Sequence, residues 1–190
     1  NRSLRHRVSR TLALSSWLVL LASCGGGSSS VSSSGANTVV ATPTEVPVRV
    51  SADTPVPPGC SGGSESGSFY LNADVEPWAA VHPTNAAVVV AAWQQDRSTN
   101  GGARAVVVAA STDGGASWQR RLLPFSRCGG ARAGSAGDFE RASDPWVDVG
   151  PTGILHATAL GFNPRDSEFG TGILVSRSLD NGQTWSDPMR

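Results

Sequence analysis

The sequence predicts an all-β protein, and three observations carry that prediction. Its apolar runs are short, rich in β-branched residues and separated by turn residues, with no long stretch of helical periodicity. The tripeptide EPW at 76–78 returns as DPW at 144–146, and the frame Ser-x-Asp-x-Gly-x-(Ser/Thr)-Trp stands at 111–118 and again at 178–185. Because a fixed period of 67 or 68 residues indicates a repeated structural unit, we expect two copies of one unit.

Four strands are expected in each unit. In the first unit the apolar runs predict strands at 78–82, 87–93, 103–110 and 118–123. In the second unit they predict strands at 146–149, 154–160 and 172–177, and a fourth that begins at Trp185. Four antiparallel strands form one blade of a β-propeller. The predicted fold is therefore a β-propeller of which about two blades are visible, at about 73–124 and 141–190.

The repeated Ser-Asp frame falls at the turn between the third and fourth strands. Asp113 can accept hydrogen bonds from N–H groups of the turn, and Gly115 allows a positive φ. Ser111 adds a hydroxyl, and Trp118 buries a large ring whose indole N–H can reach a carbonyl. We interpret the frame as a structural staple that each blade needs once. The second copy places the same four residue types at Ser178, Asp180, Gly182 and Trp185.

This frame resembles the Asp-box, or bacterial neuraminidase repeat, of sialidases and related propellers. The resemblance covers roughly residues 76–190 and implies a sialidase-type propeller that closes as a six-bladed ring in the complete protein. In that family the boxes are structural and lie away from the active site. The implied activity is that of an exo-α-sialidase, a glycoside hydrolase in which arginines bind the substrate carboxylate. An aspartate serves as acid/base, and a tyrosine assisted by a glutamate serves as nucleophile.

Blade geometry together with the sialidase resemblance implies the face on which a ligand would bind, because in sialidases the substrate sits on the face opposite to the Asp-boxes. In a four-stranded blade the second turn and the link to the next blade share the face opposite to the Ser-Asp turns. That face holds the charged residues of 94–102 and of the link 124–144, each of which has a structural ion pair or a solvated loop charge as its alternative reading. Arg97 and Arg141 are the better candidates, since a forked guanidinium suits a sugar carboxylate. The residues concerned are Asp96, Arg97, Arg132, Asp138, Glu140, Arg141 and Asp144, of which Asp144 is expected to be structural because Glu76 repeats it.

The chain departs from the sialidase pattern at the catalytic positions. No Arg-Ile-Pro type motif occurs, and the single tyrosine, Tyr70, precedes the first blade and is expected to be a packing residue. We therefore assign no catalytic residue. The alternative function is a non-catalytic propeller that binds glycans or proteins, or that serves as a scaffold.

The N-terminal segment resembles a lipoprotein signal. Four arginines precede an apolar run, and LASC at 21–24 resembles a lipobox, so we expect a signal peptide at 1–23 and a lipid on Cys24. An ordinary cleaved signal is the alternative. Residues 24–59 are Gly/Ser-rich and then Pro/Thr-rich, which predicts a flexible tether before a folded part at 60–190. Because Asn1 is not an initiator residue, we expect a fragment of an exported, membrane-anchored bacterial protein, located in the periplasm or at the cell surface.

Composition excludes several other functions. Fifteen basic and fifteen acidic residues give zero net charge, so nucleic acid binding is not indicated. No lysine occurs, which excludes a Walker A loop and a Schiff base within these residues. AGSAG at 133–137 lacks the strand and helix of a serine-hydrolase elbow.

Cys60 and Cys128 are expected to form a disulfide, with a metal pair or free thiols as alternatives. Because His82 and His156 lack metal-ligand spacing, neither a metal nor a cofactor is expected.

Overall fold

A computed structural model of the chain describes residues 46–63, 67–164 and 170–190. The expected signal peptide, Cys24 and most of the expected tether lie outside the described residues. Within the described part the chain is all-β, with seven strands and one short 3-10 turn. No helix in this part is long and apolar enough to cross a membrane. The all-β prediction is confirmed.

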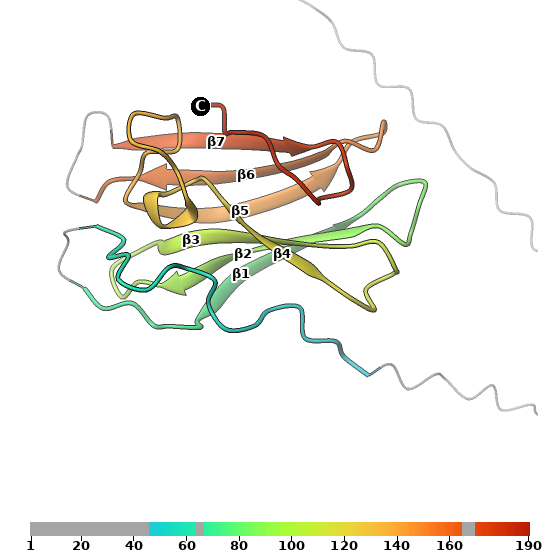
Figure 1. Cartoon of the computed structure of the whole chain (residues 1–190), viewed down its shortest axis with the longest axis horizontal. Helices are drawn as coiled ribbons and strands as arrows, with labels where there is room; N and C mark the ends of the chain where they lie inside the picture. Colours follow the sequence, from blue (N-terminus) through green and yellow to red (C-terminus); the bar gives the residue numbers. More distant parts are fainter. Residues whose placement is uncertain (1–45, 64–66, 165–169) are drawn as a thin grey trace, which may run out of the picture. The chain divides into compact units, whose positions relative to one another are not determined.

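The first unit is a complete four-stranded antiparallel meander (Figure 1). Its strands are β1 (Asp74–Val81), β2 (Val89–Arg97), β3 (Ala103–Ser111) and β4 (Gln119–Leu123), each paired with the strand before it. All nine residues of β3 are buried, since the strand has neighbours at both edges and packed side chains on both faces. This unit matches the four strands that the sequence predicts.

The second unit forms three strands and the start of a fourth. The 3-10 turn η1 (Arg127–Gly129) lies in the link, and β5 (Arg141–Val149), β6 (Leu155–Phe162) and β7 (Thr171–Ser178) follow as an antiparallel meander. The expected fourth strand is reduced to one bridge between Val175 and Met189, whose two backbone bonds both measure 2.9 Å. The two units together are what a partial propeller requires.

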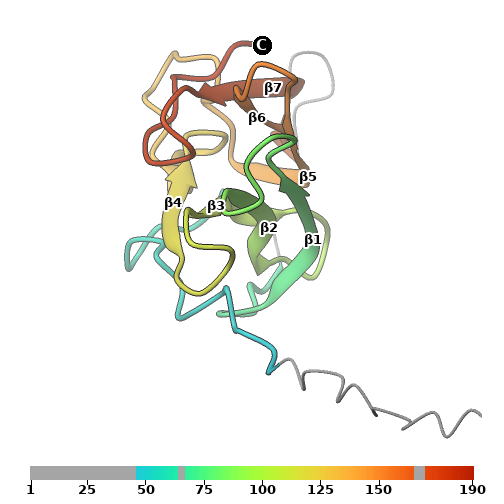
Figure 2. The ribbon, with the colours of Figure 1, turned by 90° about the vertical axis from the view of Figure 1, so that its right-hand side faces the viewer.

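The two sheets pack face to face around one core (Figure 2). By backbone pairing the seven strands form one open sheet, because a single bridge, Ala103 to Ala142, joins β3 to β5. We call β1–β4 the first sheet and β5–β7 the second sheet, since side-chain packing rather than the ladder holds these two parts together. Alternate apolar residues of facing strands bury one face of each sheet, as the period of two along a strand requires. The first sheet contributes Val90, Ala92, Val106, Val108 and Leu123, and the second contributes Val147, Val149, Leu155, Ala157, Ala159 and Leu174.

The first strand of each sheet carries the same irregularity. β1 and β5 begin at Asp74 and Arg141, earlier than the predicted Trp78 and Trp146, because pairing continues on both sides of a bulge. The residue before each proline has a positive φ, 54° at Glu76 and 50° at Asp144. The bulges let the two tryptophans stack with ring centroids 3.7 Å apart. The sequence predicted the repeat of this motif but not its geometry.

Residues 46–63, which we call the N-terminal arm, pack against the first sheet. Val50 contacts the cluster of Trp93, Val107 and Ala109, and Val56 contacts a second cluster around Ala105. The sequence predicts a flexible tether for residues up to 59, whereas in the structure residues 46–59 belong to this packed arm. The difference arises because two valines among the prolines and threonines find apolar partners that the composition did not reveal.

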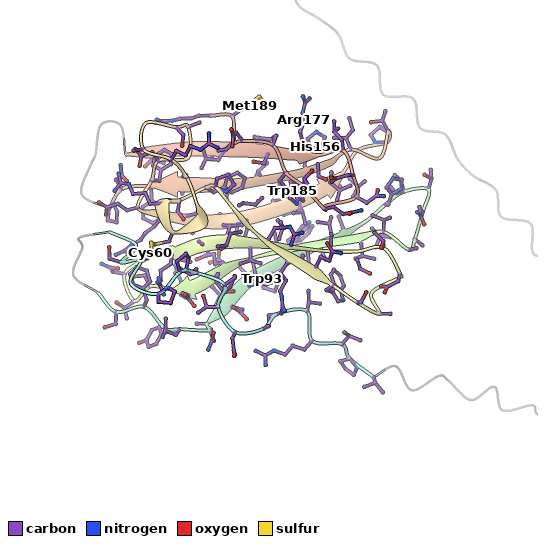
Figure 3. All side chains as sticks on the ribbon, viewed as in Figure 1. Cys60, Trp93, His156, Arg177, Trp185 and Met189 are labelled. Carbon is purple, nitrogen blue, oxygen red and sulfur yellow. A yellow bond between two sulfur atoms is a disulfide. The ribbon has the colours of Figure 1, made fainter. Side chains whose placement is uncertain are left out.

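A disulfide joins the arm to the link between the sheets. Cys60 and Cys128 form the pair that the sequence predicts, with Cα atoms 5.7 Å apart and a sequence separation of 68 (Figure 3). The Arg104 guanidinium donates to the Cys60 carbonyl at 2.6 Å, which fixes the same part of the arm a second time.

Candidate functional site

The Ser-Asp turn of the first sheet is closed by its own side chains. Asp113 accepts from the Ser117 N–H at 2.9 Å and from the Ser117 hydroxyl at 2.5 Å. The Ser111 hydroxyl donates to Asp113 at 2.7 Å and accepts from the Gly115 N–H at 2.8 Å. The Trp118 indole N–H donates to the Gly115 carbonyl at 2.9 Å, and Gly115 has a φ of 93°. Every side chain of the frame thus has a structural role.

The turn of the second sheet repeats this network. Asp180 accepts from Thr184 at 2.9 and 2.5 Å, Ser178 bonds Asp180 and Gly182 at 2.7 and 2.8 Å, and Trp185 donates to Gly182 at 3.2 Å. The pKa of each aspartate is lowered to about 2. The largest cause is a side-chain hydrogen bond, from Ser117 to Asp113 in the first turn and from Thr184 to Asp180 in the second. Both carboxylates are therefore ionised at neutral pH, and their oxygens accept hydrogen bonds within the turn.

The strand register separates these turns from the predicted ligand face. Ser111 pairs with Val89 at one end of the first sheet, whereas Arg97 pairs with Ala103 at the other end. The turn after Arg97 and the start of β5 lie at this second end, since Ala103 also pairs with Ala142. The candidate residues at 96–97 and 138–141 consequently lie away from both Ser-Asp turns, as blade geometry predicts.

Two of the candidates are buried and structural. Asp96 is 0% exposed, forms a 3.1 Å ion pair with Arg104, and accepts from Thr54 at 2.7 Å and from the Asn72 N–H at 2.9 Å. Arg141 is also 0% exposed, donates to the Asn100 side chain at 2.6 Å, and lies over the Phe69 ring. Asp96 thereby holds the N-terminal arm, and Arg141 holds the turn after β2. Neither side chain reaches a ligand at the surface.

Two acidic candidates share an arginine that the sequence analysis missed. Arg127 bonds Asp138 at 2.7 Å and lies 3.6 Å from Glu140, while half of its own side chain stays exposed. The Gly134 N–H and then the Arg127 guanidinium lower the pKa of Asp138, so this carboxyl is ionised. Glu140 keeps one buried carboxylate oxygen without a hydrogen bond. Arg127 was missed because its neighbours in the sequence give it no motif.

Arg97 is the candidate whose geometry best suits a ligand. Its Nη1 donates to the Gly102 carbonyl at 2.9 Å and to the Gln94 side-chain oxygen at 3.3 Å, and the side chain is half-buried. Among the residues that the structure describes, its Nε and Nη2 have no partner. A guanidinium that is anchored on one nitrogen and open at its other edge can bind a carboxylate through two parallel bonds.

The remaining candidates lie at the surface. Arg132 and Asp144 are exposed, and Asp144 occupies the bulge of β5. Tyr70 is 59% exposed, which corrects the expectation that it packs, and its N–H donates to the Arg97 carbonyl at 2.9 Å. No group of three or more His, Cys, Asp or Glu side chains suited to a metal occurs in the described ranges.

Comparisons with known proteins give partial similarities. No protein-family model matches the chain, and no curated protein matches it. A Hadza microbial sialidase, Hz136, is 20% identical over 60% of this chain and 25% of its own, with a TM-score of 0.45. A protein of unknown function from Dyadobacter fermentans is 17% identical over 67% and 38%, with a TM-score of 0.42. A glycosyl hydrolase from Bacteroides ovatus is 18% identical over 63% and 32%, with a TM-score of 0.40.

The chain therefore spans only 25% to 38% of the length of these three structures. The chain's own features define its fold. These are two successive antiparallel meanders joined by one bridge, a shared core and one turn network that occurs twice.

Proposed function

We propose that this chain is part of a sialidase-like glycoside hydrolase, in which Arg97 binds the carboxylate of an acidic sugar. The observation that carries the proposal is that Arg97 is anchored through Nη1 alone, with no described partner on Nε and Nη2, at the end of the sheets opposite the Ser-Asp turns. An arginine fork in a half-buried position is well suited to a sugar carboxylate, since charge-assisted bonds are shorter and stronger than neutral ones. The identification of the turns as Asp-boxes is part of the same proposal.

A complete ring is also part of the proposal. The face of the second sheet that points away from the first carries Ile173, which is 61% exposed, together with Met189, which is also 61% exposed. Figure 3 labels His156, Arg177 and Met189 on this side of the molecule. A further blade packed on this face would bury these apolar side chains, as the six-bladed ring implied by the Asp-box resemblance requires.

The test is binding and turnover of a sialoside by the full exported protein. We expect N-acetylneuraminate to bind and its methyl ester, which lacks the free carboxylate, to bind at least tenfold more weakly, because charged hydrogen bonds contribute roughly 1.5–3 kcal/mol each. Arg97→Ala should abolish the difference between the two ligands. Equal affinity for the acid and the ester in the wild-type protein would refute the proposed role of Arg97.

A second candidate function is a glycan-binding propeller without catalysis. It is favoured because two aspartates considered for this face are engaged in the structure: Asp138 is held by Arg127, and Asp96 is buried and paired with Arg104. Turnover of a fluorogenic sialoside by the full protein separates the two functions. Binding without turnover at several pH values would show that the protein is a binding module rather than a glycosidase.

Attachment to the cell envelope is proposed from the sequence of 1–24 alone. We expect Cys24 to carry lipid and to hold the protein at a membrane through its tether. Labelling cells with a radioactive fatty acid tests this, with Cys24→Ala as the control that should lose the label. If the Cys24→Ala variant were still labelled, the lipid would be attached at another residue.

A further inference from the structure

Gln94 connects the bulge of β1 to Arg97. Its side chain is 0% exposed, and all of its polar atoms have partners. The amide nitrogen donates to the Glu76 carboxylate and, at 3.2 Å, to the Ser143 hydroxyl. The amide oxygen accepts from Arg97 at 3.3 Å. Three residues from two strands of the first sheet and one residue from β5 are thus joined in one network.

The direction of this network follows from the chemistry of Glu76. An ionised carboxylate can only accept hydrogen bonds, so the amide group facing it must be the NH2 end of Gln94. The oxygen of the same planar amide then has to point the other way, toward Arg97. Because a guanidinium can only donate, Arg97 requires the same orientation, so Glu76 and Arg97 fix the Gln94 amide from opposite ends.

We propose that Glu76 and Gln94 are positioning residues for Arg97. They hold its Nη1 so that the edge formed by Nε and Nη2 is presented to a carboxylate ligand. The proposal rests on the anion-binding role of Arg97 proposed above, and it assigns roles to two residues that make no contact with the ligand themselves. The positive φ of Glu76 fits this role, because backbone strain of this kind persists only where the surrounding structure fixes it.

The second sheet supplies a natural control. Leu160 pairs with Ser143 just as Gln94 pairs with Val75, so a leucine occupies the equivalent position there. Asp144 repeats the exposed carboxylate and the positive φ of Glu76. The bulge thus occurs twice, whereas the amide that would connect it to an arginine occurs only in the first sheet.

The variant Glu76→Gln separates positioning from charge by the sign of its effect. If Glu76 acts only through its negative charge, removing that charge should strengthen the binding of an anion. If Glu76 helps to orient Gln94, the glutamine that replaces it can also donate, so the Gln94 amide is held from the Arg97 side alone, Arg97 is less firmly fixed, and binding should weaken. Asp144→Asn removes one negative charge from the equivalent bulge without touching Gln94.

The experiment is a calorimetric titration of the full exported protein and three variants with N-acetylneuraminate. We expect Glu76→Gln and Gln94→Leu each to raise the Kd about tenfold, the effect of one charge-assisted bond. Asp144→Asn should leave the Kd unchanged or lower it. If Glu76→Gln instead follows Asp144→Asn, the positioning role is wrong. Gln94→Leu is chosen because Leu160 already occupies the equivalent site of the second sheet.

A second readout separates failure of this proposal from failure of the proposed function. The NMR relaxation of the Arg97 Nε–H reports the order of the guanidinium without any ligand. We expect an ordered group in the wild-type protein and in Asp144→Asn, and a mobile one in Glu76→Gln and Gln94→Leu. Lack of N-acetylneuraminate binding together with this pattern would overturn the ligand and leave the positioning intact. An unchanged Arg97 signal in both variants would overturn the positioning.

Discussion

The two sheets share one repeat but differ in how they are covered. All residues of β3 in the first sheet are buried, whereas its counterpart β7 in the second sheet alternates between buried and exposed positions. The first sheet lies between the second sheet and the N-terminal arm, whereas among the described residues no comparable layer covers the outer face of the second sheet, where Ile173 is 61% exposed. The difference shows that burial in this fold is set by the neighbouring layer, because the strands themselves are arranged alike.

The Ser-Asp turns repeat this contrast on a smaller scale. Their internal hydrogen bonds agree to within 0.3 Å, the difference between the indole bonds of 2.9 and 3.2 Å. Their surroundings do not agree. A Cβ on Gly182 would meet the Cβ of Ala110 at 2.5 Å, whereas one on Gly115 would meet only its own Trp118, at 3.7 Å. The second turn therefore docks on the first sheet, and the first turn has no comparable neighbour in the described residues.

The largest expected effect comes from removing the ion pair that holds the arm to the first sheet. Asp96→Ala leaves Arg104 buried without its charged partner, which should cost about 3–5 kcal/mol in the free energy of unfolding. The matched control is Asp138→Ala, because its Arg127 pair is partly exposed and should contribute less than about 1 kcal/mol. Urea unfolding of both variants measures this. Similar losses would show that the arm does not depend on Asp96.

Removing the disulfide should come next. Cys60→Ser together with Cys128→Ser opens a closed loop with a separation of 68 residues, which should cost roughly 2–4 kcal/mol. Hydrogen exchange should then rise around Trp93 in the first sheet and stay unchanged around Leu174 in the core between the sheets. Equal increases at both places would mean that the arm does not protect the first sheet selectively.

A smaller effect distinguishes the two turns directly. Gly115→Ala should cost about 1–2 kcal/mol, because alanine resists a positive φ. Gly182→Ala carries the same cost and an added contact with Ala110, so it should be worse by about 1–3 kcal/mol. Thermal unfolding of the two variants measures the difference. Equal losses would mean that the second turn is not packed against the first sheet.

The smallest effect concerns pH and should be the same for both turns. Asp113 and Asp180 have a pKa lowered from 3.8 to about 2, so each stabilises the folded state above pH 3.8 and loses that contribution as the pH falls toward 2. Asp113→Asn and Asp180→Asn should each reduce the slope of stability against pH by a similar amount in this window. A large difference between the two slopes would contradict the equivalence of the turns.

Much of the fold could be predicted because the repeat carries local information. The hydrogen-bond donors and acceptors of each turn all lie within the same eight residues, so the roles of Ser111, Asp113 and Trp118 could be predicted without knowledge of their surroundings. The disulfide between Cys60 and Cys128 could also be predicted, because no further Cys or His lies near either cysteine in the sequence to suggest a metal site. The bulges could not be predicted, because a positive φ at Glu76 or Asp144 depends on the pairing of residues on both sides.

The candidate site was harder to predict because burial decides it. Asp96 and Arg97 are adjacent charged residues, and both are of a type usually found at the surface. In the structure the N-terminal arm encloses Asp96, whereas the Nε and Nη2 of Arg97 have no described partner. That outcome depends on Thr54 and Asn72, which are far from Asp96 in the sequence. Gln94 gave no signal either, since a glutamine within an apolar strand has no motif. Only the three-dimensional pairing reveals its connection to Glu76.

The stacked tryptophans of the two bulges provide a spectroscopic signal that reports the contact between the two sheets. Trp78 and Trp146 belong to different sheets, and their ring centroids are 3.7 Å apart at an interplanar angle of 22°. Indoles so close couple their electronic transitions, so the pair should give an exciton couplet in the circular dichroism spectrum. The couplet depends on the spacing of the sheets rather than on the content of β-structure. Its loss would therefore report the separation of one layer from the other while each layer is still folded.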